Sequence, residues 1–253
     1  IWPEEDREIV TMHPLNSAQY VREKFNYHKN KQFLENKKKN ILIIGDSQAQ
    51  DFVNLIYESG YNSKFNISTR HITPRCGNLN IELNLIKELK KYKKENCFKE
   101  TYYDEILKKK IEKSDYIFLV SAWEFDEIKY INKSIQNIEK ITNAKIYVVG
   151  RKIFPNINWS TSRLISIDKN SRPSTKLKVD KKHMINQKLM KSLFNENNNF
   201  INLHDLICQK DICPVFDLNS NLLSYDGSHF TKKGAKYVSK LLVKEGIFQK
   251  IFN

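Results

Sequence analysis

The sequence predicts an α/β fold in which a parallel sheet is covered by helices on both faces. Short apolar runs recur along the chain, and segments with a helical pattern separate them. The first run, "NILIIG", is rich in β-branched residues, which is typical of a strand buried inside a parallel sheet. A chain of 253 residues with 40% hydrophobic content can bury one substantial core of this kind.

The elements are expected in a regular order. Residues 1–15 are polar, contain two prolines and should form an extended arm. Strands are expected at 40–45, 65–72, 115–123, 145–150 and 199–206. Helices are expected at 17–34, 49–58, 81–95, 99–113, 124–142, 180–195 and 231–245. The stretch 151–179 reads as irregular, and the domain plan is an arm and helix at 1–36 followed by a catalytic domain at 37–253.

The composition favours acidic partners. The net charge is +14, from 43 Lys+Arg against 29 Asp+Glu. We interpret the excess, mostly Lys in runs such as "NKKKN", first as a solvated surface and second as a preference for an anionic glycan. No basic stretch carries the interleaved aromatic residues of a nucleic-acid platform, so no nucleic-acid partner is expected.

Two further properties of the sequence concern its cellular context. No window approaches the roughly 18 uninterrupted apolar residues of a membrane span. The chain begins with Ile1 instead of Met and has no basic-then-apolar leader, so we expect a piece of a longer protein.

The chain has four cysteines, Cys76, Cys97, Cys208 and Cys213. They allow three connectivities of two disulfides. The last two are close in sequence and are expected to pair, which leaves the first two for the second bond. Two disulfides would indicate an oxidising compartment such as the bacterial periplasm or cell surface. Reduced thiols, or a metal site with His204 or His229, are the alternatives; no CxxC pair exists, the spacing matches no common zinc pattern, and no metal is expected.

The stretch "IIGDSQAQDF", residues 43–52, joins the first strand to a helix. Ser47 can be an ordinary helix cap there. It can also be a nucleophile, because ligands of such sheets bind beyond the carboxyl ends of the strands, and Ser47 lies at that edge. The same edge receives residues 75–78 and 121–123 after the next two strands.

A base for Ser47 is found near the end of the chain. His229 lies in "SYDGSHFTKKGAKYV", three residues after Asp226 and directly before the last helix. An Asp at this spacing can bind Nδ1 and fix the tautomer, which leaves Nε2 free to take a proton from a serine. The alternative is a simple turn at Asp226. The other histidines are expected to be structural or surface residues, namely His13, His28, His71, His183 and His204.

"GDS" after the first strand and "DxxH" before the last helix together resemble the motif pair of the SGNH/GDSL hydrolase superfamily, over about residues 40–245. The resemblance implies a three-layer α/β/α sandwich, flavodoxin-like, with a central parallel sheet of about five strands. It also implies that Ser47 is the nucleophile, His229 the base and Asp226 its orienting acid.

The oxyanion hole of that superfamily uses the backbone N–H of the serine, a glycine of a second block and an asparagine of a third block, GxND. Gly77 in "PRCGN" matches the second block. The third block should follow "DYIFLV", where this chain reads "SAWEFD" with neither Gly nor Asn. Asn78 is therefore the candidate substitute donor, with the region of Trp123 as the alternative, because one lost donor costs about a hundred- to a thousandfold in rate.

A narrower resemblance rests on "ILIIGDSQAQDFVN", "RHITPRCG", "VSAWE" and "VVGRKIF". These segments are similar to the periplasmic SGNH domain that follows the membrane domain of bacterial acyltransferases that O-acetylate surface polysaccharides. The resemblance implies an O-acetyltransferase tethered on the periplasmic side of the inner membrane by a membrane domain of the same chain. Acetyl groups from acetyl-CoA would cross through that domain and pass through acyl-Ser47 to a polysaccharide or lipopolysaccharide O-antigen, with no cofactor in this domain.

Two other functions remain open from the sequence: a secreted carbohydrate esterase with the same triad, and a non-catalytic glycan-binding domain. The long stretch from residue 151 to 179 is expected to border the acceptor groove. The candidate substrate-binding residues are Trp123, Arg151, Lys152 and Trp159. A sugar could stack on Trp159, or this side chain could anchor the loop to the core.

Overall fold

The computed structural model describes Asp6, residues 14–89, Cys97, residues 101–155, Leu164, residues 166–194 and residues 199–252. Its main sheet has five parallel strands in the order β2-β1-β3-β4-β6. The strands are β1 (Lys39–Gly45), β2 (Phe65–His71), β3 (Tyr116–Val120), β4 (Lys145–Val149) and β6 (Phe200–Ile201). The predicted α/β class and five-stranded parallel sheet are thereby confirmed.

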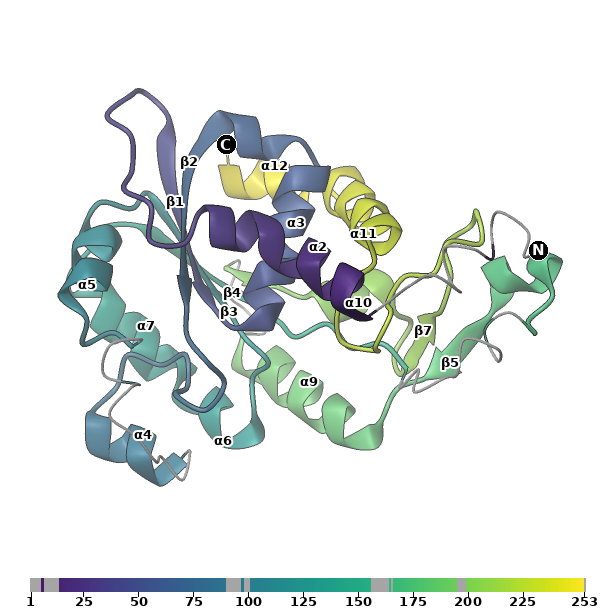
Figure 1. Ribbon diagram of the computed structural model, residues 1–253. Coiled ribbons are helices and arrows are strands. Elements are labelled where there is room, and N and C mark those ends of the chain that lie inside the picture. The colour runs from purple at the N-terminus through teal and green to yellow at the C-terminus, as the bar shows by residue number, and fades with distance from the viewer. Residues whose placement is uncertain are drawn as a thin grey trace.

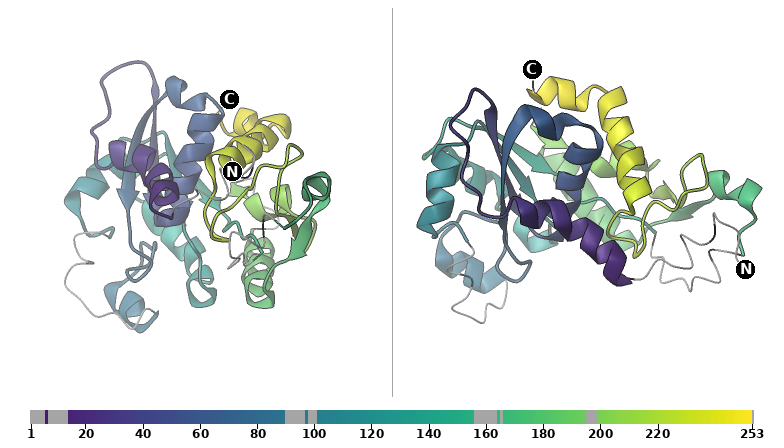
Figure 2. Two further views of the ribbon diagram at one scale, coloured as in Figure 1. Left: turned by 45° about the vertical axis from the view of Figure 1, so that its right-hand side comes forward. Right: turned by 45° about the horizontal axis from the view of Figure 1, so that its top comes forward.

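Helices cover both faces of the sheet (Figures 1 and 2). One face carries α2 (Pro14–Tyr27), α3 (Ser47–Glu58), α10 (Leu203–Ile207), α11 (Lys232–Lys244) and α12 (Ile247–Phe252). The other carries α4 (Leu83–Leu89), α5 (Glu105–Glu112), α6 (Phe125–Ile128), α7 (Ile131–Glu139) and α9 (Lys181–Leu193). Within β1, Ile41 and Ile43 point into the first core, while Leu42 and Ile44 point into the second. This alternation explains why the strand is apolar throughout, and the three-layer sandwich is confirmed.

The N-terminal helix α2 is part of the first core. Val21 and Phe25 are buried, and the Phe25 carbonyl accepts the Thr69 hydroxyl of β2 at 2.7 Å. On the other side, the Asn54 amide of α3 donates to the Tyr20 carbonyl at 3.2 Å. Helix α2 therefore packs with residues 37–253, and the expected division into an arm and helix at 1–36 and a catalytic domain at 37–253 stays a prediction.

Several elements differ from the sequence prediction. The stretch 151–179 contains the 3-10 helix η3 (Lys169–Ser174) and the strand β5 (Lys176–Lys178), which pairs antiparallel with β7 (Ile212–Pro214). This small sheet projects at one end of the molecule (Figure 1). The fifth strand of the main sheet is shorter than expected, because the Asn202 side chain accepts the Asp205 N–H and starts α10 there. Another 3-10 helix, η1 (Tyr61–Lys64), precedes β2, and the expected helix at 124–142 is divided into α6 and α7.

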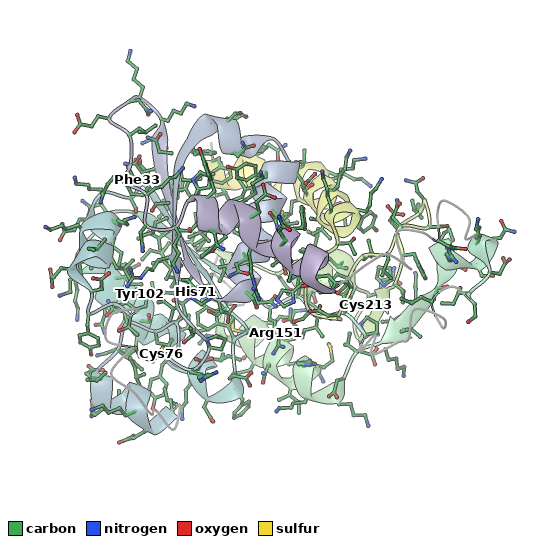
Figure 3. All side chains as sticks on the ribbon, viewed as in Figure 1. Phe33, His71, Cys76, Tyr102, Arg151 and Cys213 are labelled. Carbon is green, nitrogen blue, oxygen red and sulfur yellow. A yellow bond between two sulfur atoms is a disulfide. The ribbon has the colours of Figure 1, made fainter. Side chains whose placement is uncertain are left out.

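Both predicted disulfides are present. Cys76 is bonded to Cys97 and Cys208 to Cys213, with Cα–Cα separations of 5.5 and 4.3 Å (Figure 3). The second bond lies beside the buried His204, whose Nε2 is 2.7 Å from the Lys210 carbonyl. Within the described residues, no helix combines the length and the apolar character that crossing a membrane requires.

Candidate active site

Ser47 is the first residue of α3, directly after β1. The turn between them requires Gly45, because a Cβ at this position would lie 1.6 Å from the Val120 carbonyl oxygen of β3. The chain adds β2 on one side of β1 and β3 on the other, so the strand order reverses between β1 and β3, and such switch points are where these folds bind ligands. The local packing of the sheet thus holds Ser47 at the switch point.

The helix cap is Asp46 rather than Ser47. The Asp46 carboxylate accepts the Gln48 N–H at 2.8 Å and the Ala122 N–H at 2.9 Å. Burial raises the pKa of Asp46, and these two backbone donors oppose that shift. The carboxylate therefore joins the loop after β1 to the loop after β3, and the Ser47 hydroxyl has no hydrogen-bond partner among the described residues.

Asp226 and His229 form the hydrogen-bonded pair that their spacing predicts. The distance from Asp226 Oδ2 to His229 Nδ1 is 2.7 Å, and Asp226 Oδ1 accepts the backbone N–H groups of Ser228 and His229 at 2.8 and 2.7 Å. Burial opposes ionisation of Asp226, but the hydrogen bonds and the charge of His229 outweigh it and lower the pKa of this carboxyl. A carboxylate so fixed holds the imidazole with Nε2 facing away from it.

The turn that carries this pair is fastened on two sides. The Ser224 hydroxyl donates to the His229 carbonyl at 2.6 Å and accepts the Gly227 N–H at 3.0 Å. The Tyr225 ring stacks on the His229 ring, with 6.0 Å between centroids and 21° between planes. The orientation of the imidazole is therefore set by a carboxylate at one edge and an aromatic ring over one face.

Behind the turn lies a buried ion pair between α3 and the loop after β4. Lys152 Nζ is 2.5 Å from Asp51 Oδ2 and 2.9 Å from Gln48 Oε1. The other Asp51 oxygen accepts the Phe230 N–H at 3.3 Å, and the ammonium lies over the Phe230 ring. Burial raises the pKa of Asp51 and lowers that of Lys152, and each charge opposes the shift of the other.

This ion pair bears on one sequence prediction. The Lys152 side chain is 1% exposed and its ammonium is bonded to Asp51, so its contact with a glycan stays a prediction. The ion pair fixes the residue after His229 to the helix that begins with Ser47.

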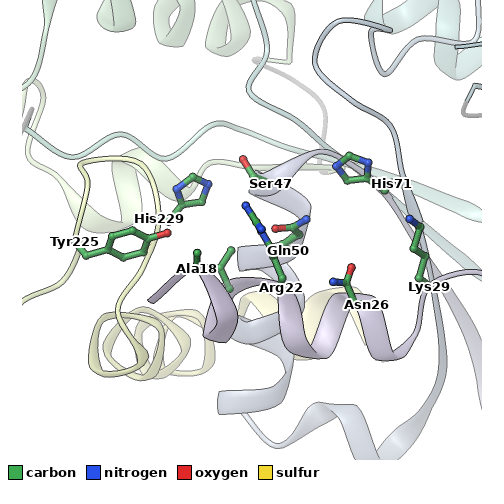
Figure 4. A pocket seen from close by; sticks show the side chains of 10 residues that line it. Ala18, Arg22, Asn26, Lys29, Ser47, Gln50, His71, Tyr225 and His229 are labelled. Atoms are coloured by element: carbon green, nitrogen blue, oxygen red, sulfur yellow. The ribbon is translucent and has the colours of Figure 1, made fainter. Parts of the chain in front are cut away.

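Ser47 and His229 line one cavity of about 500 Å³ (Figure 4). The cavity is lined by Ala18, Val21, Arg22, Asn26, Lys29, Ser47, Gln50, His71, Tyr225 and His229. The predicted nucleophile and base therefore share one cavity, and Asp226 is bonded to the far nitrogen of the base. The residue types that acyl transfer by a serine uses therefore line the same space.

Several residues of this cavity were missed in the sequence. His71 was expected to be structural, yet it pairs with Gly45 in the register of β1 and β2 and lies at the same sheet edge as Ser47. The rule that parallel strands end together could have identified it. No sequence signal identified Arg22, Asn26 and Lys29, because they reach the cavity through the packing of α2.

The candidate oxyanion donors lie near the end of β1. The backbone N–H groups of Ser47 and Gly77 donate to no other described residue. The Asn78 amide donates to the Ile44 carbonyl at 3.0 Å, and its oxygen accepts the Tyr102 hydroxyl at 2.8 Å. Asn78 thus packs the loop after β2 onto β1, and its role in the oxyanion hole, like that of Gly77, stays a prediction.

The remaining substrate-binding predictions have different outcomes. Trp123 is 1% exposed and its indole N–H donates to the Val149 carbonyl at 3.0 Å, so this ring packs inside the protein, and its contact with a glycan stays a prediction. Trp159 lies outside the described residues. Arg151 is partly exposed, lies 3.9 Å from a Glu124 oxygen, and stays a candidate.

A second cavity of about 200 Å³ lies on the other side of the 226–229 turn. Its lining residues are Arg151, Lys152, Ile153, Phe154, Asp180, His183, Asp226, Gly227 and Ser228. His229 lines the larger cavity and Asp226 the smaller one, so the turn separates them.

Comparison with solved structures concerns the fold of the chain. One solved structure with the same fold is the periplasmic domain of the Salmonella ser. Paratyphi A lipopolysaccharide acetyltransferase, with a TM-score of 0.61 and 15% identity over 96% of this chain and 99% of that one. The N-terminal part of BF1531 from Bacteroides fragilis, which contains a phosphatase domain, matches with a TM-score of only 0.34, at 8% identity over 91% of this chain and 56% of that one. No curated protein matches the sequence.

The match to a family model shows to which family the chain belongs. The model described as "SGNH domain (fused to AT3 domains)" matches residues 18–244, which include helix α2 from Ala18 onward as well as both motifs. This chain therefore belongs to the family of SGNH domains that are fused to AT3 domains.

Proposed function

We propose that this domain is a serine-dependent O-acetyltransferase that passes an acetyl group through acyl-Ser47 to a hydroxyl of a cell-surface polysaccharide. The observation that carries the proposal is the shared cavity of Ser47 and His229, with Asp226 on His229 Nδ1 at 2.7 Å. Membership of the family fused to AT3 domains supports transfer over simple hydrolysis, since it suggests a membrane acyltransferase domain in the same protein and a periplasmic location.

The proposed reaction has two halves. In the first, His229 Nε2 takes the Ser47 hydroxyl proton while Ser47 Oγ attacks the acetyl carbonyl. The Ser47 and Gly77 N–H groups stabilise the tetrahedral oxyanion, and its collapse gives acetyl-Ser47 as the protonated His229 returns the proton to the leaving group. In the second half, His229 takes the proton of a sugar hydroxyl, which attacks acetyl-Ser47 and regenerates the serine.

The acceptor decides between transferase and esterase. Water attacking acetyl-Ser47 would release acetate, whereas a bound sugar hydroxyl close to the carbonyl would be acetylated instead. A lipopolysaccharide O-antigen is one candidate acceptor, because the solved relative is named a lipopolysaccharide acetyltransferase.

The test compares the unmodified protein with Ser47→Ala on an activated acetyl ester, with and without candidate surface polysaccharides. Intact-mass spectrometry follows acetyl on the protein, and NMR follows acetyl on the glycan. We expect one acetyl group on Ser47, lost faster when glycan is present, with acetyl appearing on the glycan. Release of acetate at a rate indifferent to glycan would make the domain an esterase. Equal behaviour of both proteins would favour a non-catalytic glycan-binding domain.

A further inference from the structure

One wall of the larger cavity is formed by helix α2 and the residues that follow it. Ala18, Arg22 and Asn26 are spaced four residues apart, so they lie on one face of the helix. Lys29 continues this wall, because it follows α2 and bridges to Thr69 of β2. Figure 4 shows these four side chains along the side of the cavity that faces Ser47 and His71.

Among the residues that the structure describes, this wall carries positive charge without a counter-charge. Arg22 and Lys29 are exposed, and neither makes an ion pair or a side-chain hydrogen bond with a described residue. None of the described residues that line the cavity is an Asp or Glu. By contrast, Lys24 of the same helix is paired with Glu23 at 2.7 Å.

The wall also offers neutral groups suited to a sugar. The amides of Asn26 and Gln50 can donate and accept hydrogen bonds with hydroxyls. Ala18 and Val21 add a small apolar surface for the ring carbons. At about 500 Å³, the cavity has the size of a small-ligand site.

We propose that the acceptor is an acidic glycan, and that Arg22 and Lys29 bind the carboxylate of a sugar residue next to the hydroxyl that reacts. A guanidinium matches a carboxylate with two parallel hydrogen bonds, and a lysine adds a point charge. This inference rests on the proposed function, and it places the acceptor beside helix α2, whereas the sequence placed it beside residues 151–179.

The test measures binding alone, in the Ser47→Ala background, so that no turnover is needed. The probes are an oligosaccharide of alternating glucuronic acid and N-acetylglucosamine and its carboxyl-reduced, neutral counterpart. We expect the acidic probe to bind about tenfold more tightly at low salt, since two exposed charge contacts are worth about this much together. Adding about 0.5 M sodium chloride should remove the preference, because exposed charges are screened.

Arg22→Gln/Lys29→Gln should abolish the preference for the acidic probe. The matched control is Lys109→Gln/Lys113→Gln, which makes the same change in charge on α5 and just after it, on the opposite face of the sheet, and should keep the preference. Equal affinity for both probes, binding of neither, or equal losses in the two double variants would overturn the proposal. Ester turnover without dependence on Ser47 would instead refute the proposed function, and the binding result would still stand by itself.

Discussion

The two cavities on either side of the 226–229 turn differ in charge and in what they can do. The larger one is lined by Ser47 and His229 together with cationic residues, and no described residue of its lining is a carboxylate. The smaller one has residues of both charge signs, since Arg151 and His183 line it together with Asp180 and Asp226. The turn therefore presents His229 to one cavity and Asp226 to the other. Ser47 and His229 share their cavity with residues of α2, whereas the sequence favoured the loop after β4.

The two cavities also depend on different kinds of support. The smaller one is backed by the buried pair of Lys152 and Asp51 and lies close to the Cys208–Cys213 bond, since both sulfurs contact the Ile153 carbonyl. The larger one is walled by exposed side chains of α2. Changes beside the smaller cavity should therefore affect stability, and changes in the larger one should affect chemistry.

The largest expected effect is the loss of rate on replacing His229, which should exceed the loss on replacing Asp226. His229→Ala should lower the rate of ester cleavage by about a millionfold, because it removes the group that takes the Ser47 proton in the proposed mechanism. Asp226→Asn should cost less, about ten thousandfold, since it removes the orienting charge but not the base. Steady-state kcat with an activated acetyl ester measures both. Equal losses would mean that the acid does more than orient the imidazole.

The second prediction concerns stability at the smaller cavity. Lys152→Met leaves the Asp51 carboxylate buried without its cation and should cost about 3–5 kcal/mol in the free energy of unfolding. Adding Asp51→Asn should restore most of the loss, because the amide oxygen can still accept the Phe230 N–H. Urea denaturation measures both variants.

Lys39→Met provides the control for that experiment. It breaks an exposed pair with Asp115, in which the Lys39 side chain is 63% exposed, and should cost less than about 1 kcal/mol. If Lys152→Met lowers the free energy of unfolding no more than Lys39→Met does, the buried pair of Lys152 and Asp51 does not stabilise the 226–229 turn.

The features that the sequence predicted depend on residues that lie close together in the chain. The apolar runs gave the sheet, and "GDS" and "DxxH" identified Ser47, Asp226 and His229, because each motif lies within one short segment. Both disulfides followed from spacing.

The features that the sequence did not predict have a common cause in tertiary packing. Lys152 and Trp123 read as polar and aromatic groups after strands, but each finds a buried partner far away in sequence, Asp51 and Val149. Arg22 and Lys29 lie in the helix predicted at 17–34, and only the packing of α2 against β2 and α3 brings them to the cavity that Ser47 lines. Such contacts carry no periodic signal.

The third prediction compares the two disulfides. Cys76–Cys97 closes a loop of 21 residues and Cys208–Cys213 one of 5. The chain-entropy argument gives a loss of about 3 kcal/mol for Cys76→Ala/Cys97→Ala and about 2 kcal/mol for Cys208→Ala/Cys213→Ala. Unfolding curves of the two double variants test the order. A larger loss at the shorter loop would indicate that Cys208–Cys213 fixes native packing around Ile153 rather than the unfolded chain.

The smallest expected effect concerns pH and links α2 to the sheet. His28 follows α2, and its Nε2 is 2.6 Å from the Tyr57 hydroxyl. Burial, together with the charges of Lys31 and Lys24, lowers the pKa of His28 from 6.5 to about 4, against a backbone hydrogen bond with Ile67 that raises it. Below pH 6.5 the unfolded chain takes up a proton that the folded one refuses, so stability should fall as the pH drops towards about 4 and then level off.

Two substitutions measure how much His28 contributes to the pH dependence of stability and compare it with a histidine at the smaller cavity. His28→Gln should flatten the decline between pH 6.5 and about 4, as measured by urea denaturation at a series of pH values. His183→Gln, at the smaller cavity, should flatten it less. Burial and Arg151 lower the pKa of His183 too, but Asp180 and Glu124 oppose that shift, whereas no carboxylate opposes it at His28. If His183→Gln had the larger effect, the loss of stability at acidic pH would depend on the charges around the smaller cavity more than on the packing of α2.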